Sequence, residues 1–466
     1  MSHATTNHPD RPLRVLFLNR SYWPEIEATG QLLTELCEDL SPRMQITVLA
    51  GQPNQNPDGQ AFQRSGAQTR HGVEIHRVWN TRFPKRSFAG KAMNLVSYFA
   101  AAWFAAMRLP RPDIVVVETD PPWLCLLGGF LRHWFGCRLV VYLQDIYPDI
   151  GVAIGTLREG RFTALLRQLF FGVHRRADRV VVLSDEMRQL LVRAGVAAER
   201  IVCIPNWIDT RTVRPMPPPN RFRDEHAAGA RFLAMYSGNL GMCQRLEDVV
   251  NAAGKLNHRS DIRFLIVGEG ARKQQLRDQA SKLRLNNLEF LPYQPKSRLG
   301  ESLTAPDVHL IPLDERVTQF LMPSKLYGVL AAGIATVAVA PVTSDLAKVV
   351  RDAQCGVVVP NGNPAALADA IAWCADHPEE LAAMGRRGRE LAVAEYDRRS
   401  VTRRFGDLLE EVAGRTTTKS SGVGEARART AAAPLNHAAM PNGHGAAHPI
   451  LATDQYQTKE HVHELC

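Results

Sequence analysis

The chain lacks the long apolar run that a membrane-spanning helix needs. Its longest one, residues 95–107 (LVSYFAAAWFAAM), is shorter than the roughly 20 residues that cross a bilayer. The eight cysteines are scattered, with no C-x-x-C pair and no Cys/His spacing of a zinc module, which disfavours disulfide scaffolds and structural zinc. Residues 1–12 are polar and contain no apolar segment typical of a signal peptide. We therefore expect a cytoplasmic protein.

Two nucleotide-binding fingerprints are also missing. The chain has neither the G-x-G-x-x-G pattern nor a P-loop lysine motif, which weakens assignments to dinucleotide oxidoreductases and ATPases. Its 466 residues are 45% hydrophobic and 22% charged, as in ordinary globular proteins, and this length fits two or three domains.

Positive charge is concentrated in one stretch, although the net charge is only +9. No acidic residue lies between Glu74 and Asp113, and bases on both sides flank an apolar run that contains Tyr98, Phe99, Trp103 and Phe104. Those bases are Arg77, Arg82, Lys85, Arg86, Lys91, Arg108 and Arg111. Residues 82–107 could lie on an anionic membrane surface or form a buried helix after a basic loop. No recognition helix or aromatic–basic strand module accompanies the charge, so nucleic-acid binding is not expected.

Short, continuously apolar runs alternate with helical patterns in both halves of the chain. In the first half the runs are 15–19, 45–51, 113–120, 138–145, 179–185 and 200–206; in the second they are 231–239, 262–270, 288–293, 308–313, 334–340 and 355–360. Such strands are buried on both faces, as in parallel sheets covered by helices. The pattern predicts an α/β fold of two doubly wound, Rossmann-like domains that face each other.

Breaks in the pattern suggest the domain boundaries. The proline-rich residues 215–219 (PMPPP) read as a linker, and residues beyond 415 have too few large apolar side chains to pack. We predict a disordered tail (1–12), a first Rossmann-like domain (13–214), a second Rossmann-like domain (215–395), a C-terminal helix that packs back on the first domain (396–414) and a disordered tail (415–466).

Candidate site residues follow the strands, because ligands of open α/β sheets bind beyond the carboxyl ends of the strands. Gly30, Gly238, Gly241 and the pair Glu269-Gly270 each lie between an expected strand and an expected helix. Glycines there let the backbone approach a ligand, and free N–H groups at a helix start can hold an anion. Each glycine could equally serve an ordinary turn.

The segment 320–333 (FLMPSKLYGVLAAG) gives a sharper signal. Ser324 is placed as a helix N-cap with Lys325 in the first turn, so N–H groups, helix dipole and lysine would all favour a diphosphate. The alternative is an exposed lysine on a helix. Asp145 ends the run 138–145 and could stabilise developing sugar charge, or it could be a turn aspartate. Glu118 and Asp120 form an E-x-D, but no further ligand spacing supports a metal.

Taken together, several ordered segments resemble the GT-B retaining glycosyltransferases of family 4, in particular the colanic-acid and O-antigen type. They are SYWPEIEATGQLLTEL, YLQDIYPDIG, IPNWID, YSGNLGMCQRLEDVV, IVGEG, MPSKLYGVLAAG and CGVVVPNGNPAALADAI, spread over about residues 14–414. The resemblance implies that residues 13–214 form the acceptor-binding domain and residues 215–395 the donor-binding domain. It implies catalytic roles for Asp145 and Lys325, with no metal and no other cofactor. It implies a donor site formed by Gly30, Gly238, Asn239, Gln244, Arg245, Glu269, Gly270, Tyr293, Ser324 and Lys325.

The chain departs from the family pattern at two places. The family usually carries Arg and Lys where this chain has Asn239 and Gln244, and Arg245 is the candidate replacement. The family's paired glutamates would align with Phe320 and Gly328, which affects the expected ribose contact.

The resemblance implies an enzyme that moves a sugar, with retention, from a UDP- or GDP-sugar to a lipid-linked oligosaccharide in exopolysaccharide or O-antigen synthesis. We expect it on the inner face of the plasma membrane, docked on anionic lipid by residues 82–107. A nucleotide-sugar 2-epimerase and a non-catalytic nucleotide-sugar-binding partner remain the alternative functions.

Overall fold

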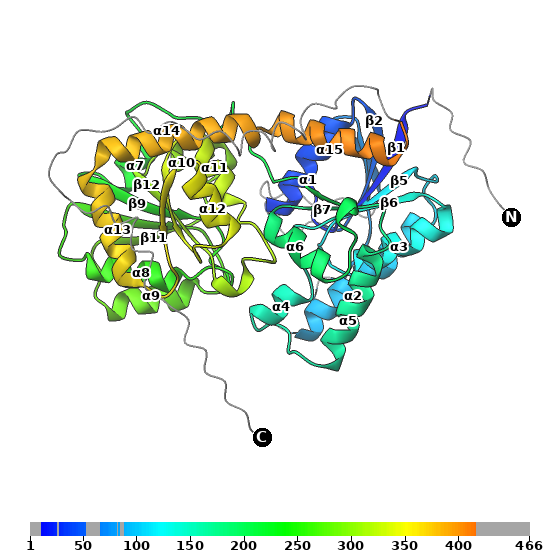
Figure 1. The fold of residues 1–466 in the computed structure, drawn as a ribbon, viewed down its shortest axis with the longest axis horizontal. Coiled ribbons are helices and arrows are strands. Elements are labelled where there is room, and N and C mark those ends of the chain that lie inside the picture. The colour runs from blue at the N-terminus through cyan, green and yellow to red at the C-terminus, as the bar shows by residue number, and fades with distance from the viewer. Residues whose placement is uncertain (1–10, 26–27, 53–65, 82, 84–87, 416–466) are drawn as a thin grey trace, which may run out of the picture. The chain divides into compact units, whose positions relative to one another are not determined.

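A computed structural model describes residues 11–25, 28–52, 66–81, 83 and 88–415. Two sheets organise these residues, and helices cover both (Figure 1). The first sheet has the strand order β3-β4-β2-β1-β5-β6-β7-β8, and the second has the order β11-β10-β9-β12-β13-β14. Every pairing is parallel except that of β3 with β4. The expected α/β class with parallel sheets in two domains is confirmed.

The N-terminal domain is built around the first sheet. Its strands are β1 (Leu13–Leu18), β2 (Met44–Ala50), β3 (Ala67–Arg70), β4 (Val73–Arg77), β5 (Ile114–Val117), β6 (Arg138–Tyr142), β7 (Arg179–Val182) and β8 (Ile201–Cys203). Its helices are α1 (Ala28–Leu40), α2 (Phe88–Ala106), α3 (Leu124–Phe135), α4 (Asp149–Ala153), α5 (Arg161–His174) and α6 (Asp185–Arg193), followed by a short 3₁₀ turn (Ala198–Arg200). Strands such as β5 are buried at every position, as their continuous apolar sequence predicts.

The C-terminal domain is built around the second sheet. Its strands are β9 (Phe232–Ser237), β10 (Ile262–Val267), β11 (Leu288–Leu291), β12 (Val308–Pro312), β13 (Ala335–Val339) and β14 (Gly356–Val359). Its helices are α7 (Arg221–His226), α8 (Leu246–Lys255), α9 (Lys273–Lys282), α10 (Leu299–Leu303), α11 (Lys325–Ala332), α12 (Asp345–Asp352), α13 (Pro364–Asp376) and α14 (Pro378–Glu395), with 3₁₀ turns at Lys296–Arg298 and Glu315–Val317.

The last helix, α15 (Arg398–Val412), packs on α1 of the N-terminal domain (Figure 1). The Arg398 guanidinium donates to both carboxylate oxygens of Asp39 at 2.8 and 2.7 Å, and the Thr402 hydroxyl donates to the same carboxylate at 3.0 Å. Phe405 is fully buried and meets the Tyr142 ring edge-on, with 5.1 Å between ring centroids. The chain therefore begins and ends its described part in the N-terminal domain.

The antiparallel strand β3 and its partner β4 were not expected from the sequence. Burial along β4 alternates, and β3 is mostly exposed at the edge of the sheet, so neither forms a continuous apolar run. The turn between them has positive φ at His71 (45°) and Gly72 (79°), as a tight two-residue hairpin requires.

The apolar run expected at a membrane surface lies on α2, and the structure corrects the role of most of its aromatic side chains. Tyr98 is fully buried, Phe99 and Trp103 pack partly against the core, and only Phe104 of the four aromatic residues is exposed. The exposed apolar stripe instead consists of Met93, Val96 and Phe104. Among the described residues, no helix is long and apolar enough to cross a membrane.

The bases around α2 also divide into different groups. Arg77 is a core residue whose guanidinium donates to the carbonyl oxygens of Gly51 and Trp23, so it is no surface cation. Arg108 and Arg111 are exposed. Arg82, Lys85 and Arg86 lie outside the described residues.

Candidate active site

Two glycine loops meet at the carboxyl ends of β9 and β10. Gly238 and Gly268 have φ values of 151° and 149°, which side chains other than glycine rarely adopt. A Cβ atom on Gly268 would lie 1.9 Å from the carbonyl oxygen of Gly238, so the two backbones are in direct contact. The loops thus leave the backbone bare at the place where a ligand of this sheet would bind.

Lys325 lies over this floor, at the start of α11. A Cβ atom on Gly238 would be 2.9 Å from the Lys325 Cε atom, and the lysine Nζ lies 5.2 Å from the centroid of the Tyr236 ring. Burial lowers the pKa of Lys325 to about 8, and the nearby thiol of Cys243 opposes this shift. An ammonium group held in partial burial gains most when an anion arrives beside it.

The start of α11 differs from the sequence prediction in one detail. Ser324 precedes the helix, but it is exposed, its backbone is already helical, and its side chain caps no N–H group. Ser324 thus holds the predicted N-cap position, but its side chain makes no capping hydrogen bond. The physical reason is that the tight turn closed by the Leu326 N–H and the Pro323 carbonyl (3.2 Å) starts the helix without a side-chain cap.

Asp145 follows β6 and reaches the segment just before Lys325. Its backbone forms a bridge with Leu321, and the next amide, of Ile146, donates to the Phe320 carbonyl at 3.0 Å. Burial raises the pKa of Asp145 to about 6, and the charge of Asp120 adds to this shift. The carboxylate is thus held among groups that disfavour its charge, which is common for catalytic carboxylates.

The charges of both Asp145 and Lys325 affect the pKa of the Cys243 thiol. Burial raises the pKa of this thiol to about 11; Asp145 adds to this rise, and Lys325 opposes it. The Cys243 carbonyl accepts the Asp314 N–H at 2.8 Å, which fixes the loop after β9. No sequence motif singles out Cys243, because its surroundings depend on tertiary packing.

Asp120 is a second residue that the sequence reading did not place in the site. The Arg20 guanidinium donates to its carboxylate at 3.1 and 2.8 Å, and the Ser21 hydroxyl also donates to it. It ends a predicted strand run just as Asp145 does, and that position could have identified it. Among the described residues, no group of His, Cys, Asp and Glu side chains is arranged to hold a metal ion.

The other predicted donor residues surround the two glycine loops. The Asn239 carbonyl accepts the Tyr236 hydroxyl at 2.7 Å, and the Gln244 Oε1 accepts the Gly241 N–H at 3.2 Å. Their neighbours Glu269, Gly270 and Tyr293 follow β10 and β11, where the Tyr293 hydroxyl donates to the Glu269 carbonyl at 3.4 Å and Lys273 pairs with the Glu269 carboxylate at 2.5 Å.

Arg245 does not have the free guanidinium that a replacement cation needs. It pairs with Glu315 at 3.2 Å and with Asp248 at 3.3 Å, so two carboxylates already neutralise it. Lys325 is therefore the better candidate for the cation at the donor site.

Gly30 lies inside the first turn of α1, not in a loop before it. A Cβ atom there would come within 3.2–3.3 Å of Glu25 and Ser21, so this glycine permits close packing of the helix on the segment after β1. Phe320 and Gly328 are both buried, and a Cβ atom on Gly328 would lie 3.2 Å from Leu303. A glutamate at position 328 would have to displace that leucine.

The site combines glycine loops and a lysine from the C-terminal domain with two carboxylates from the N-terminal domain, and each domain has a parallel sheet covered by helices. This arrangement is typical of a GT-B type of transferase, and comparison with known proteins agrees. Residues 29–212 match the family "Glycosyltransferase Family 4", and residues 219–391 match "Glycosyl transferases group 1". The chain belongs to the GT-B glycosyltransferases of family 4.

Relatives and solved structures support this assignment. The chain is 28% identical over 346 residues to WcaI of Escherichia coli (strain K12), which is named as a colanic acid biosynthesis glycosyl transferase. The match covers 69% of the chain and 82% of WcaI. It is 28% identical over 271 residues to the glycosyltransferase WbjE of Pseudomonas aeruginosa, which covers 57% of the chain and 66% of WbjE. The fold is similar to sucrose-phosphate synthase from Thermosynechococcus elongatus (TM-score 0.70, 16% identity, 87% and 100% of the two chains covered).

Proposed function

We propose that this glycosyltransferase moves a sugar, with retention, from a UDP- or GDP-sugar to a lipid-linked oligosaccharide in the synthesis of a bacterial exopolysaccharide or O-antigen. The observation that carries the proposal is the backbone bridge between Asp145 and Leu321, which brings Asp145 to the segment just before Lys325. The charges of both Asp145 and Lys325 act on the thiol of Cys243. The names of the relatives support the polysaccharide context, since WcaI is named for colanic acid biosynthesis.

The donor diphosphate would lie over the glycine loops, against Lys325 and the start of α11. Backbone N–H groups at a helix start, the helix dipole and an ammonium group all favour an anion at one point. Because Gly238 and Gly268 have no side chains, the diphosphate could approach the backbone of the two loops. Anabaena HepE, a structural neighbour with TM-score 0.66 and 16% identity over 86% of this chain, was solved in complex with UDP and glucose.

Transfer would proceed on one face of the sugar and without a metal ion. The bond between the anomeric carbon and the diphosphate oxygen breaks, and its electron pair stays on the diphosphate, where Lys325 stabilises the charge. The acceptor hydroxyl attacks from the same face, and its proton passes to the departing phosphate oxygen. The ionised Asp145 stabilises the positive charge that develops on the sugar ring.

The acceptor lipid would be met at the surface of the N-terminal domain. Met93, Val96 and Phe104 form an exposed apolar stripe on α2. Trp134, at the end of α3, is 60% exposed; it stacks on Phe130, which in turn stacks on Trp103 of α2. Exposed Arg108 and Arg111 follow α2. Apolar side chains rimmed by arginines favour an anionic bilayer interface.

Flotation with vesicles tests the membrane part. A Val96→Glu/Phe104→Glu variant should lose binding to vesicles that contain phosphatidylglycerol. Leu283→Glu, which alters an exposed leucine of the C-terminal domain, is the control and should still float. A wild-type protein that stays out of the lipid fraction would refute membrane docking.

Label transfer tests the reaction itself. The purified protein is incubated with labelled UDP- and GDP-sugars and a bacterial polyprenyl-linked glycan extract, and label is followed into the organic phase. The proposal predicts label from one preferred donor, with the anomeric configuration retained by NMR. A product formed from the donor alone, without an acceptor, would instead indicate an epimerase.

A further inference from the structure

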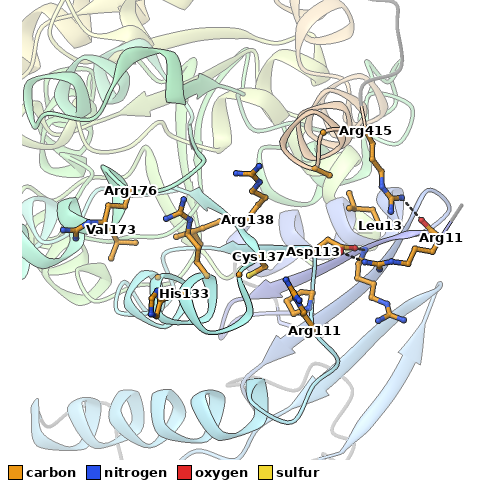
Figure 2. A pocket seen from close by; sticks show the side chains of 18 of the residues that line it. Arg11, Leu13, Arg111, Asp113, His133, Cys137, Arg138, Val173, Arg176 and Arg415 are labelled. Carbon is orange, nitrogen blue, oxygen red and sulfur yellow. Dashed lines mark hydrogen bonds and ion pairs between the residues drawn. The ribbon is translucent and has the colours of Figure 1, made fainter. Parts of the chain in front are cut away.

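A cavity lies at the end of the N-terminal sheet where the strands begin, opposite to the end that carries Asp145. It has a volume of about 900 Å³, and seven arginines but a single carboxylate, that of Asp113, line it (Figure 2). The arginines come from β1 and the segment before it, the loop before β5, the last turn of α3, the first residue of β6, the segment after α5 and the segment after α15. Segments that are far apart in sequence thus bring the same charge to one place.

Carboxylates neutralise only part of this charge. Arg11 pairs with Asp113 at 2.5 Å, and Arg132 and Arg138 share Asp178, with distances of 3.1 and 3.0 Å. The remaining four are Arg14, Arg111, Arg176 and Arg415. Within the residues that the structure describes, none of these four forms an ion pair with a carboxylate.

The ends of the helices explain some of these arginines but not all of them. Cations are favoured at helix C-termini, which accounts for Arg132 at the end of α3 and Arg176 after α5. Arg111 comes from the loop before β5 but lies against the C-terminal end of α3, which also favours its charge. Arg14 lies in β1, where its Nε donates to the neutral Gln45 Oε1 at 3.3 Å, so no helix end explains it. The Nη1 atom of Arg11 is buried and has no hydrogen-bond partner in the described part of the chain.

The geometry brings the unpaired guanidinium groups to different sides of the cavity. A Cβ atom on Gly136 would lie 3.4 Å from the Arg111 Nη2, which places this arginine against the end of α3. Arg176 projects from the end of α5, and Arg415 donates to the Arg11 carbonyl at 2.6 Å on another side (Figure 2). A single small anion could not contact all of them, whereas a ligand with several anionic groups could.

We propose that this arginine pocket binds a ligand that carries two or more phosphate groups. Arginine matches phosphate because its planar fork donates two parallel hydrogen bonds to two oxygens. The surplus of positive charge requires several negative charges on the ligand. The pocket is separate from the candidate active site, since it lies at the amino ends of the strands and Asp145 lies after their carboxyl ends.

Titration of the full chain with tripolyphosphate tests the proposal without any assay of sugar transfer. At fixed ionic strength, the wild type should bind one tripolyphosphate in this pocket, and Arg111→Glu/Arg176→Glu should weaken that binding by about 100-fold or more. The matched control is Arg386→Glu/Arg403→Glu, which reverses two exposed arginines on α14 and α15, and it should bind as the wild type does. Equal loss in both double variants, or no binding by the wild type, would overturn the proposal.

Two further arms make the result specific. Arg111→Lys/Arg176→Lys keeps the charge but removes the planar guanidinium groups, so its affinity for tripolyphosphate should lie between those of the wild type and the glutamate variant. Thermal unfolding checks that each variant is folded. Lys325→Ala should leave tripolyphosphate binding at the arginine pocket intact, so failure of the proposed transferase function would not affect this test.

The source of the phosphate groups is decided by competition. Vesicles containing cardiolipin, whose headgroup carries two phosphates, are compared with soluble tripolyphosphate. If cardiolipin vesicles displace tripolyphosphate from the wild type but not from the glutamate variant, the ligand is a lipid headgroup. If only the soluble compound binds, the ligand is a free polyphosphate. If neither binding depends on Arg111 and Arg176, the proposal is wrong.

Discussion

The two ends of the strands in the N-terminal sheet differ in how charge is arranged: the carboxyl end combines both signs, and the amino end has an excess of positive charge. Beyond the carboxyl ends of the strands, Asp120 and Asp145 lie partly buried, and Lys325 of the C-terminal domain shares their surroundings. At the amino ends, arginines outnumber carboxylates and are largely exposed. Opposite charges in partial burial suit a reaction that separates charge, whereas a surplus of one sign suits the binding of an anion.

The largest effect should come from removing the cation of the carboxyl edge. Lys325→Ala should lower kcat/KM for sugar transfer by about 1,000-fold, because the other described cations beside the glycine loops, Arg245 and Lys273, are already paired with carboxylates. The measurement is the rate of label transfer from the preferred donor. Lys282→Ala, at the exposed end of α9, is the control. Equal rates in the two variants would contradict the role of Lys325.

Neutralising the carboxylate opposite the lysine should have the next largest effect. Asp145→Asn keeps the shape of the side chain but removes its charge, so kcat should fall by about 100-fold. The control is Asp149→Asn, since Asp149 pairs with Arg167 at 2.8 Å and lies only four residues away. A comparable loss in both variants would show that the loop after β6, rather than the Asp145 charge, matters.

Asp120→Asn should change the pH dependence more than the rate. The charge of Asp120 raises the pKa of Asp145, so its removal should lower that pKa and move the acid limb of kcat/KM to lower pH. The measurement is kcat/KM between pH 5 and 8 for the variant beside the wild type. An acid limb at the same pH in the variant and the wild type would contradict the influence of Asp120 on the pKa of Asp145.

The smallest effect should appear at the amino edge. Asp178→Asn frees Arg132 and Arg138 from their shared carboxylate, so affinity for tripolyphosphate should rise by about five-fold. The same change replaces the charged acceptor of the Leu139 N–H by a neutral amide oxygen, and this weaker hydrogen bond should cost about 1 kcal/mol in the free energy of unfolding. Calorimetric titration and thermal unfolding measure the two effects, and a weakened affinity would contradict the pocket.

The sequence predicted the buried strands well, for a physical reason. The run of β5 is apolar at every position, and β13 is buried at every position with Thr336 as its one polar residue, because both faces of a parallel sheet are covered. Strands β3 and β4 are short and partly exposed, so their pattern is weak and they were missed.

The site was predictable only where it follows from strand order. Asp145 and Lys325 were found because each stands after a strand or at a helix start on the expected edge. The contact of Asp145 with residue 321 and the shared field around Cys243 depend on the packing of the two domains, which sequence spacing does not report. The arginine pocket was missed because its members extend from Arg11 to Arg415.

The pH dependence of kcat/KM tests the central claim, that charged Asp145 and charged Lys325 act together in sugar transfer. Asp145 is charged above its pKa of about 6, and Lys325 is charged below its pKa of about 8, so the free enzyme should be most active between these values. The account predicts a bell-shaped profile whose alkaline limb is absent in Lys325→Arg, because arginine stays protonated. A profile that is flat from pH 5 to 9, or an alkaline limb that persists near pH 8 in that variant, would contradict it.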